Sequence, residues 1–239
     1  MHTSNLIKKL SMATAGAAFV ALGATLVNAS VANAAIFALD NSHSWATGSD
    51  TLESVLGFDM VEVPNDPLQA EFSFISTLSS PLGSLTFNPV VEKRDIGSSW
   101  QTWSHGYDEE VYFTGNSTNF MNISLPSNIA AFDLYVEPNN FFTFQIEVIA
   151  SNGSATTLTQ NVQGFRGAKY FGFYTTDGDI ISHIKITAPQ AALGLAAGEF
   201  RMASSQPVPE PASALGLLLV ITLGAGSALK IGRGKRERE

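Results

Sequence analysis

Apolar and polar side chains alternate with a period of two residues along several segments of the chain. In residues 142–148 every second side chain is apolar, and the same alternation recurs in residues 131–136 and 180–187. A period of two puts neighbouring side chains on opposite faces of a β-strand. The pattern therefore predicts strands of an antiparallel sheet with one buried and one solvated face.

Two glycine-containing dipeptides separate predicted strands. Asn152-Gly153 and Asp177-Gly178 each lie between two such runs and favour the positive φ angles of tight turns, so each predicts a β-hairpin. Residues 188–198 are rich in Ala and Gly and are predicted to form a loop. Further strands are predicted at residues 54–63, 71–77, 84–91, 111–114, 120–125 and 198–203. About nine or ten short strands at this spacing predict an all-β, antiparallel β-sandwich of jelly-roll type over residues 35–206.

The first 34 residues have a different pattern. Two lysines precede an uncharged apolar stretch over residues 10–27, and Ala32 and Ala34 form an A-x-A pattern of small residues. This order is that of a secretory signal peptide, with cleavage predicted after Ala34. Cleavage after Ala29 and an uncleaved membrane anchor are the alternatives.

The C-terminal end combines an apolar run with a basic tail. Residues 212–229 carry no charge, and ~18 residues at ~1.5 Å each would span ~27 Å as a helix, enough for a bilayer core. The positive-inside rule would keep the tail in the cytoplasm, where its cations are Arg233, Lys235, Arg236 and Arg238. A transmembrane helix is therefore predicted at about residues 212–231, with a buried soluble helix as the alternative.

Pro209, Glu210 and Pro211 stand just before this run. Two prolines around a glutamate form a stiff, extended segment that does not readily enter a helix or a sheet. The order of Pro-Glu-Pro, apolar span and basic end, over residues 207–239, resembles the PEP-CTERM sorting signal of bacterial exosortase substrates. The resemblance implies a Gram-negative-type bacterium, recognition by an exosortase, and removal of the tail on the way to the cell surface or the exopolysaccharide matrix.

Charge and composition limit the partners of the predicted ectodomain. Residues 35–206 contain eighteen acidic and six basic side chains. Binding to nucleic acid needs clustered Lys and Arg, so nucleic acid is excluded as a partner. Anionic polymers should be repelled as well unless divalent cations bridge them. The chain has no cysteine, which excludes disulfides, thiolate metal sites and cysteine nucleophiles.

A second resemblance covers about residues 85–203. It rests on the segments 103–107, 111–115, 131–138 and 170–184. These segments look like the sandwich ectodomains that are common among PEP-CTERM proteins. The resemblance implies a fold and an exported location, and it implies no activity.

The densest group of chemistry-bearing side chains lies in residues 100–110. Trp103 and Tyr107 have flat apolar faces on which a sugar ring could stack, and Asp108 and Glu110 could accept hydrogen bonds from its hydroxyls. A glycan-binding site is therefore one interpretation of this segment.

Two other interpretations of the same segment stay open. His105 as a general base, with Asp108 or Glu110 as its partner or as an acid, would suit a hydrolase. Alternatively, Trp100 and Trp103 pack in the core and the acidic residues decorate a loop. We favour this last interpretation, because closely spaced tryptophans in an all-β chain are more often core than platform.

Asp177 and Asp179 flank Gly178 in one of the predicted turns. Two carboxylates on a tight loop could contribute to a Ca²⁺ site, which takes six to eight oxygen ligands. Turn formation explains the same residues more simply, and no other cofactor is predicted.

The sequence as a whole predicts an exported surface or matrix protein that is structural or adhesive and not an enzyme. Its expected partners are signal peptidase, an exosortase, the membrane before processing, and extracellular polysaccharide. A carbohydrate-binding module is the alternative function, and a secreted hydrolase is the third.

Overall fold

The computed structural model describes residues 35–40, 51–66 and 68–205. The predicted signal peptide, the sorting motif Pro209-Glu210-Pro211 and the apolar run at 212–229 lie outside these residues. Among the described residues, no helix has the length and apolar character needed to cross a membrane.

Within the described residues, twelve strands join in one antiparallel sheet. A short helix and a 3-10 helix accompany them, α1 (Leu52–Leu56) and η2 (Gln190–Ala192). The strands are β1 (Ile36–Leu39), β2 (Val61–Glu62), β3 (Phe74–Ser80), β4 (Gly83–Asp95), β5 (Glu110–Phe113), β6 (Phe120–Ser124), β7 (Ile129–Pro138), β8 (Thr143–Asn152), β9 (Ser154–Gln163), β10 (Lys169–Thr175), β11 (His183–Thr187) and β12 (Leu195–Ser204). The prediction of an all-β, antiparallel fold is confirmed.

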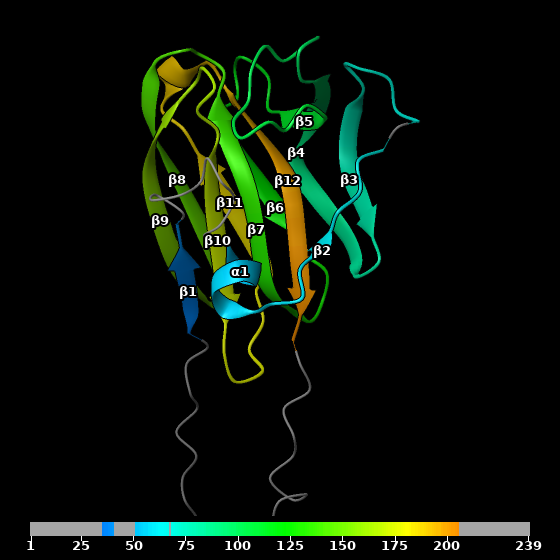
Figure 1. The fold of residues 1–239 in the computed structure, drawn as a ribbon, viewed down its shortest axis with the longest axis vertical. Coiled ribbons are helices and arrows are strands. Elements are labelled where there is room, and N and C mark those ends of the chain that lie inside the picture. Colours follow the sequence, from blue (N-terminus) through cyan, green and yellow to red (C-terminus); the bar gives the residue numbers. More distant parts are fainter. Residues whose placement is uncertain (1–34, 41–50, 67, 206–239) are drawn as a thin grey trace, which may run out of the picture. The chain divides into compact units, whose positions relative to one another are not determined.

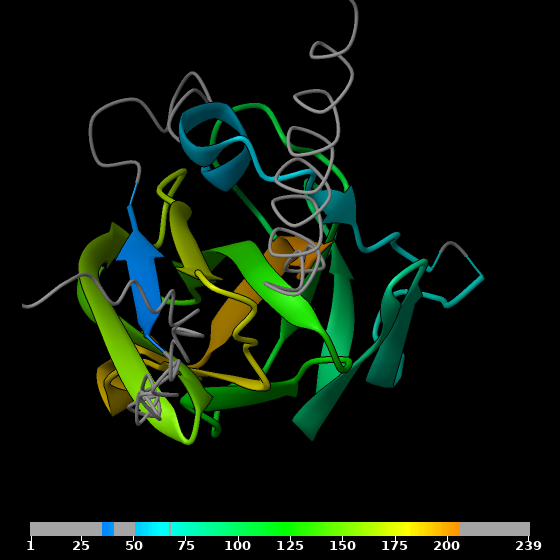
Figure 2. The same ribbon diagram turned by 90° about the horizontal axis from the view of Figure 1, so that it is seen from below.

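The sheet curls into a nearly closed, barrel-like form (Figures 1 and 2). Its strand order is β1-β10-β7-β12-β5-β4-β6-β11-β8-β9, with β2 beside β12 and β3 beside β4. The two ends of this order meet, because the Thr156 hydroxyl on β9 donates a hydrogen bond of 2.5 Å to the Ile36 carbonyl on β1. The predicted sandwich of two separate sheets is replaced by one continuous sheet, since the long strand β4 pairs with β5 near its end and with β6 nearer its start.

Apolar side chains from most of the strands fill the interior. On β8, Ile146, Val148 and Ala150 are fully buried, while the intervening side chains are more exposed. This pattern confirms the period-two interpretation. Aromatic rings also pack there, with the Phe200 ring centroid 5.8 Å from that of Phe87 and 6.2 Å from that of Phe132.

The predicted strand at residues 54–63 is wrong over most of its length. It overlaps the last three residues of the five-residue helix α1 and contains only the two-residue strand β2. The helix begins at a capping box in which the side chains of Thr51 and Ser54 satisfy each other's backbone amides, and it ends at Gly57, whose φ is 73°. A single helical turn is too short to show a 3.6-residue period, so its pattern could not be told from that of a strand.

Of the two predicted hairpins, one is confirmed. Asn152-Gly153 joins β8 to β9, which pair along their whole length. Asp177-Gly178 does form a turn, with φ angles of 59° and 82°, but β10 and β11 take different partners. The chain leaves the turn across the barrel end, where the Ile181 amide bonds to the Ile129 carbonyl. The predicted loop at residues 188–198 is also shorter than expected, because β12 begins at Leu195.

The barrel has two distinguishable ends. β1 begins and β12 ends at the same end, the lower one in Figure 1. The turns at residues 138–142, 163–168 and 188–194 meet at the opposite end, which we call the distal end. Three backbone hydrogen bonds join them: Asn139 N–H to Gly194 O, Asn140 N–H to Ala192 O, and Gly164 N–H to Phe142 O.

Candidate functional site

Strand β7 is buried on both faces, although its alternation predicted one wet face. Its inward side chains belong to the barrel interior. The outward side chains Asp133, Tyr135 and Glu137 are at most 6% exposed, because residues 96–109 and α1 fold back over the outside of the barrel. We call this second layer the outer cluster. Of the candidate residues at 100–110, it contains Trp100, Trp103, His105 and Tyr107, and it does not contain Asp108 or Glu110.

Both tryptophans of residues 100–110 belong to the outer cluster. Trp103 is 4% exposed and its indole N–H donates to Glu199 Oε1 at 2.6 Å. Trp100 is 6% exposed and donates to Glu137 Oε2 at 2.8 Å. Trp103 therefore has no free face on which a sugar ring could stack. The glycan platform expected there is contradicted, and the core interpretation of both tryptophans holds.

The other expected glycan contacts do not share one surface. The Tyr107 hydroxyl donates to the Glu110 carbonyl at 2.9 Å, and its ring packs near Trp103. The Glu110 carboxylate forms an ion pair of 2.5 Å with the buried Lys93 ammonium. Asp108 is exposed and lines, with Glu110, an acidic hollow of about 590 Å³. Of the four residues, Trp103, Tyr107 and Glu110 are thus held by structural contacts, and Asp108 is the exposed one.

His105 is paired with Glu199 and with neither Asp108 nor Glu110. Its Nε2 lies 2.8 Å from Glu199 Oε2, and its Nδ1 lies 2.7 Å from Ser104 Oγ. Ser104 is 5% exposed, and its Oγ also lies 2.7 Å from the Ala168 carbonyl oxygen. The Glu199 carboxylate accepts from Nε2–H, and the single hydroxyl proton of Ser104 can go to the Ala168 carbonyl or, where Nδ1 carries no proton, to Nδ1. These contacts join residues 104–105 to β12 and to the β9–β10 turn.

A cavity of about 360 Å³ opens between His105, Tyr107, Tyr135, Glu199 and Arg201. The imidazole, carboxylate, guanidinium and phenol groups around it could hold a small polar molecule. The cavity is therefore polar. Its imidazole and carboxylate groups, those of His105 and Glu199, already bond to each other.

Arg201 is fixed at this cavity by the buried carboxylate of Asp133. Its Nε lies 3.0 Å from Oδ1 and its Nη2 lies 2.7 Å from Oδ2. The Tyr170 hydroxyl donates to the same carboxylate at 2.8 Å. Burial raises the pKa of Asp133, and the guanidinium of Arg201 offsets part of that rise. The bidentate geometry is that of a strong charge-assisted pair.

Glu137 is the second buried carboxylate on β7. It accepts hydrogen bonds from the Trp100 indole and from the Gly167 amide, at 2.8 Å and 3.1 Å. Burial raises its pKa to about 7, and these donors oppose the rise. Its role is to tie residues 100–102 and the β9–β10 turn to the barrel wall.

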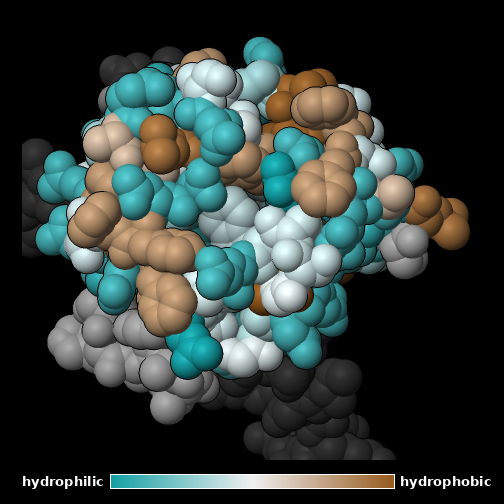
Figure 3. Space-filling model, turned by 90° about the horizontal axis from the view of Figure 1, so that it is seen from above, coloured by the Kyte–Doolittle hydropathy of each residue, from teal (hydrophilic) through white to brown (hydrophobic). Residues whose placement is uncertain are grey.

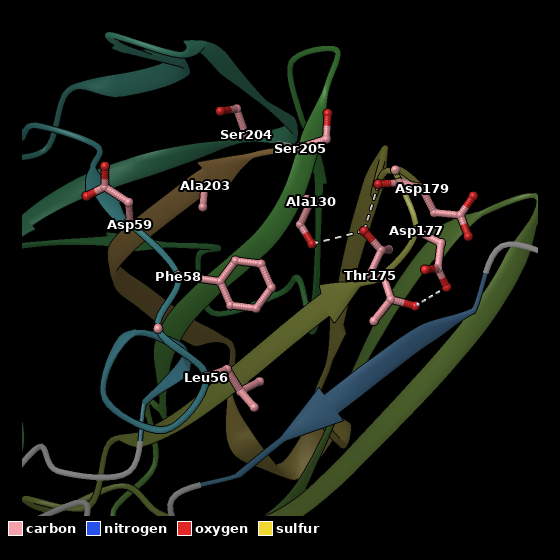
Figure 4. A pocket seen from close by; sticks show the side chains of 13 residues that line it. Leu56, Phe58, Asp59, Ala130, Thr175, Asp177, Asp179, Ala203, Ser204 and Ser205 are labelled. Atoms are coloured by element: carbon pink, nitrogen blue, oxygen red, sulfur yellow. Dashed lines mark hydrogen bonds between the residues drawn. The ribbon is translucent and has the colours of Figure 1, made fainter. Parts of the chain in front are cut away.

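Asp177 and Asp179 line another cavity, of about 510 Å³ (Figure 4). The Asp177 carboxylate accepts a hydrogen bond from the Thr176 hydroxyl at 3.0 Å, and the Asp179 carbonyl accepts one from Thr175 at 2.7 Å. Asp59 lies on the opposite side of the cavity (Figure 4). Over residues 35–40, 51–66 and 68–205, no three His, Asp or Glu side chains gather as a metal site would require. The Ca²⁺ site stays a prediction.

Sequence reasoning missed the buried carboxylates of Asp133 and Glu137 and the partly buried carboxylate of Glu199. A signal for Asp133 was present, because residues 129–136 are apolar at all the remaining positions. Such a nearly continuous run indicates a strand buried on both faces. A polar residue within it must then find a buried partner.

Comparison of the sequence with protein-family models finds no match, and comparison with curated proteins finds none either.

Proposed function

We propose that this chain is an exported bacterial protein, processed by an exosortase and delivered to the cell surface or the exopolysaccharide matrix. The observation that carries the proposal is the order of Pro209-Glu210-Pro211, an uncharged run over residues 212–229, and a basic tail. Each part has a physical role: an extended segment that a processing enzyme can grip, a span of bilayer length, and cations that stay in the cytoplasm. The signal-peptide pattern of residues 1–34 fits the same route.

The described part of the chain is compatible with display from such a tail. β12 ends at Ser204, at the same end of the barrel where β1 begins (Figure 1). A protein held through the residues that follow β12 would present the distal end to its surroundings. We therefore propose a structural or adhesive role for the barrel.

Catalysis is not part of this proposal. The Ser104–His105–Glu199 series lies in the outer cluster, where Ser104 is 5% exposed and its hydroxyl lies 2.7 Å from the Ala168 carbonyl oxygen. These contacts connect residues 104–105 to β12 and to the β9–β10 turn, which is a structural task.

The processing step can be tested in a bacterium that carries an exosortase. The full chain is expressed as wild type, as Glu210→Ala and as Pro207→Ala, and the surface and membrane fractions are compared by chain length. The wild type and Pro207→Ala are expected to be shortened and released to the surface. Glu210→Ala is expected to keep its C-terminal segment and to remain in the membrane fraction. Identical processing of all three chains would contradict the proposal, because Pro207 lies outside the motif and Glu210 at its centre.

A further inference from the structure

The distal end is a rigid assembly of three turns. Besides the backbone hydrogen bonds that join them, the turns pack so closely that a Cβ on Gly164 would lie 2.7 Å from the Pro138 carbonyl oxygen and closer still to that of Asn140. Side chains carried by these turns are therefore held in fixed relative positions, as a binding surface requires.

Four large apolar side chains are exposed on these turns. Phe142 is 73% exposed, and Phe141, Phe165 and Leu193 are each between 41% and 48% exposed. The rings of Phe141 and Phe165 lie edge to face, with centroids 5.5 Å apart. Figure 3, which views this end of the molecule, shows hydrophobic side chains gathered among hydrophilic ones. Exposed apolar groups in such a cluster mark a contact surface more often than scattered ones do.

Two hollows run beside this aromatic cluster. One, of about 230 Å³, is lined by Phe141, Asn139 and Gln101, among others. The next, of about 380 Å³, is lined by Gln101, Tyr107 and Arg166, among others. Gln101 and Thr102 line both, so the two hollows follow each other along residues 99–107. An elongated depression with aromatic, amide and hydroxyl walls suits a linear chain of sugar rings, which have an apolar C–H face and hydroxyls around the edge.

The charge of this surface differs from that of the rest of the ectodomain. No carboxylate lines either hollow. The three turns, residues 138–142, 163–168 and 188–194, contain a single charged residue, the exposed Arg166. An anionic polymer that is repelled by the acidic side chains of residues 35–206 would therefore meet at this end an exposed cation in a hollow that no carboxylate lines.

Two residues at this end have a strained backbone conformation although burial of their side chains does not require it. Arg166 and Leu193 both have a φ of 55°, a left-handed conformation that favours glycine. Both side chains are exposed, so neither is required for burial. Strained positions that keep an exposed functional side chain are typical of binding surfaces.

From these observations we propose that the distal end binds an acidic polysaccharide. Phe141 and Phe142 contact the apolar faces of the sugar rings, Gln101 and Asn139 bond to hydroxyls, and Arg166 pairs with a carboxylate of the polymer. The inference deepens the proposed matrix function and rests on it. It also moves the glycan site away from Trp103, to a surface that residues 100–110 share with the distal turns.

The test is affinity electrophoresis of the full chain in a mild detergent, through gels that contain polygalacturonate or dextran. The wild type is expected to be retarded by polygalacturonate in proportion to its concentration, less so at high salt, and far less by neutral dextran. Phe142→Ala and Arg166→Gln are each expected to lower the apparent affinity for polygalacturonate at least about fivefold.

Matched controls come from exposed side chains that lie outside the three distal turns. Phe74→Ala removes a ring that is 74% exposed on β3, and Lys185→Gln removes an exposed cation on β11. Both controls should bind like the wild type, and all four variants should melt within a few degrees of it. Absence of retardation by polygalacturonate would overturn the inference, as would equal losses in the variants and their controls. Neither result bears on the processing of Glu210→Ala, so the failure of this inference is distinguishable from failure of the proposed function.

Discussion

Replacing Trp103 by alanine separates a structural tryptophan from a ligand-binding one. The side chain is 4% exposed and packs in the outer cluster, so the substitution removes an almost fully buried indole. Truncation of a buried tryptophan costs about 3–5 kcal/mol. The Glu199 carboxylate also loses its 2.6 Å hydrogen bond from the indole. For a domain of this size we expect the melting temperature to fall by about 10 °C.

The measurement is thermal and urea unfolding of the full chain in mild detergent, followed by far-ultraviolet circular dichroism. Phe74→Ala is the control, because it removes an aromatic ring that is 74% exposed and should change the free energy of unfolding by less than about 0.5 kcal/mol. If Trp103→Ala melts within one or two degrees of the wild type, the tryptophan is not a structural part of the outer cluster. Loss of polysaccharide binding without loss of stability would restore the glycan platform at Trp103.

Three further predictions concern the contacts that hold the outer cluster and the distal end. Arg201→Met should lower the free energy of unfolding by about 3 kcal/mol, measured in urea, because it leaves the buried Asp133 carboxylate without its cation. The pKa of Glu137 is raised from 4.5 to about 7, so the folded state binds this proton more tightly than the unfolded state does. The free energy of unfolding should therefore fall by up to about 3 kcal/mol as the pH rises from about 4.5 to 7. Glu137→Gln should remove most of that fall in pH-dependent urea melts, and an unchanged slope would contradict the assignment. Gly164→Ala should cost about 1–3 kcal/mol, because its Cβ would collide with the Asn140 carbonyl, and a variant of wild-type stability would show that the distal turns are not closely packed.

The strand pattern of the barrel could be predicted from the sequence because alternation needs only local information. Residues 142–148 and the turn at Asn152-Gly153 both specify structure within a few positions, and β8 and β9 pair as expected. Asp177-Gly178 carried the same turn chemistry, yet the strands that it joins pair elsewhere. Whether neighbouring strands pair with each other depends on the closure of the whole sheet, which no local pattern encodes.

The outer cluster could not be predicted, because it depends on an irregular segment that folds back over a sheet. Residues 96–109 lack any period, so their contact with β7 and β12 was not foreseeable. That contact buries Trp103 and Trp100 and supplies donors to Glu137 and Glu199. Asp108 and Glu110 line one hollow, but no pattern in the sequence indicated that Lys93, seventeen positions before Glu110 in the chain, forms an ion pair with it.

The most direct test of the account is the intact mass of the protein recovered from the cell surface of a bacterium with an exosortase. We expect a chain that starts at Ala35 and lacks the residues from about 212 onward. That mass would show that both terminal patterns act as removable signals around residues 35–206. A chain that keeps Met1 would contradict the export signal, and one that keeps Arg238 would contradict the sorting signal on which the proposed function rests.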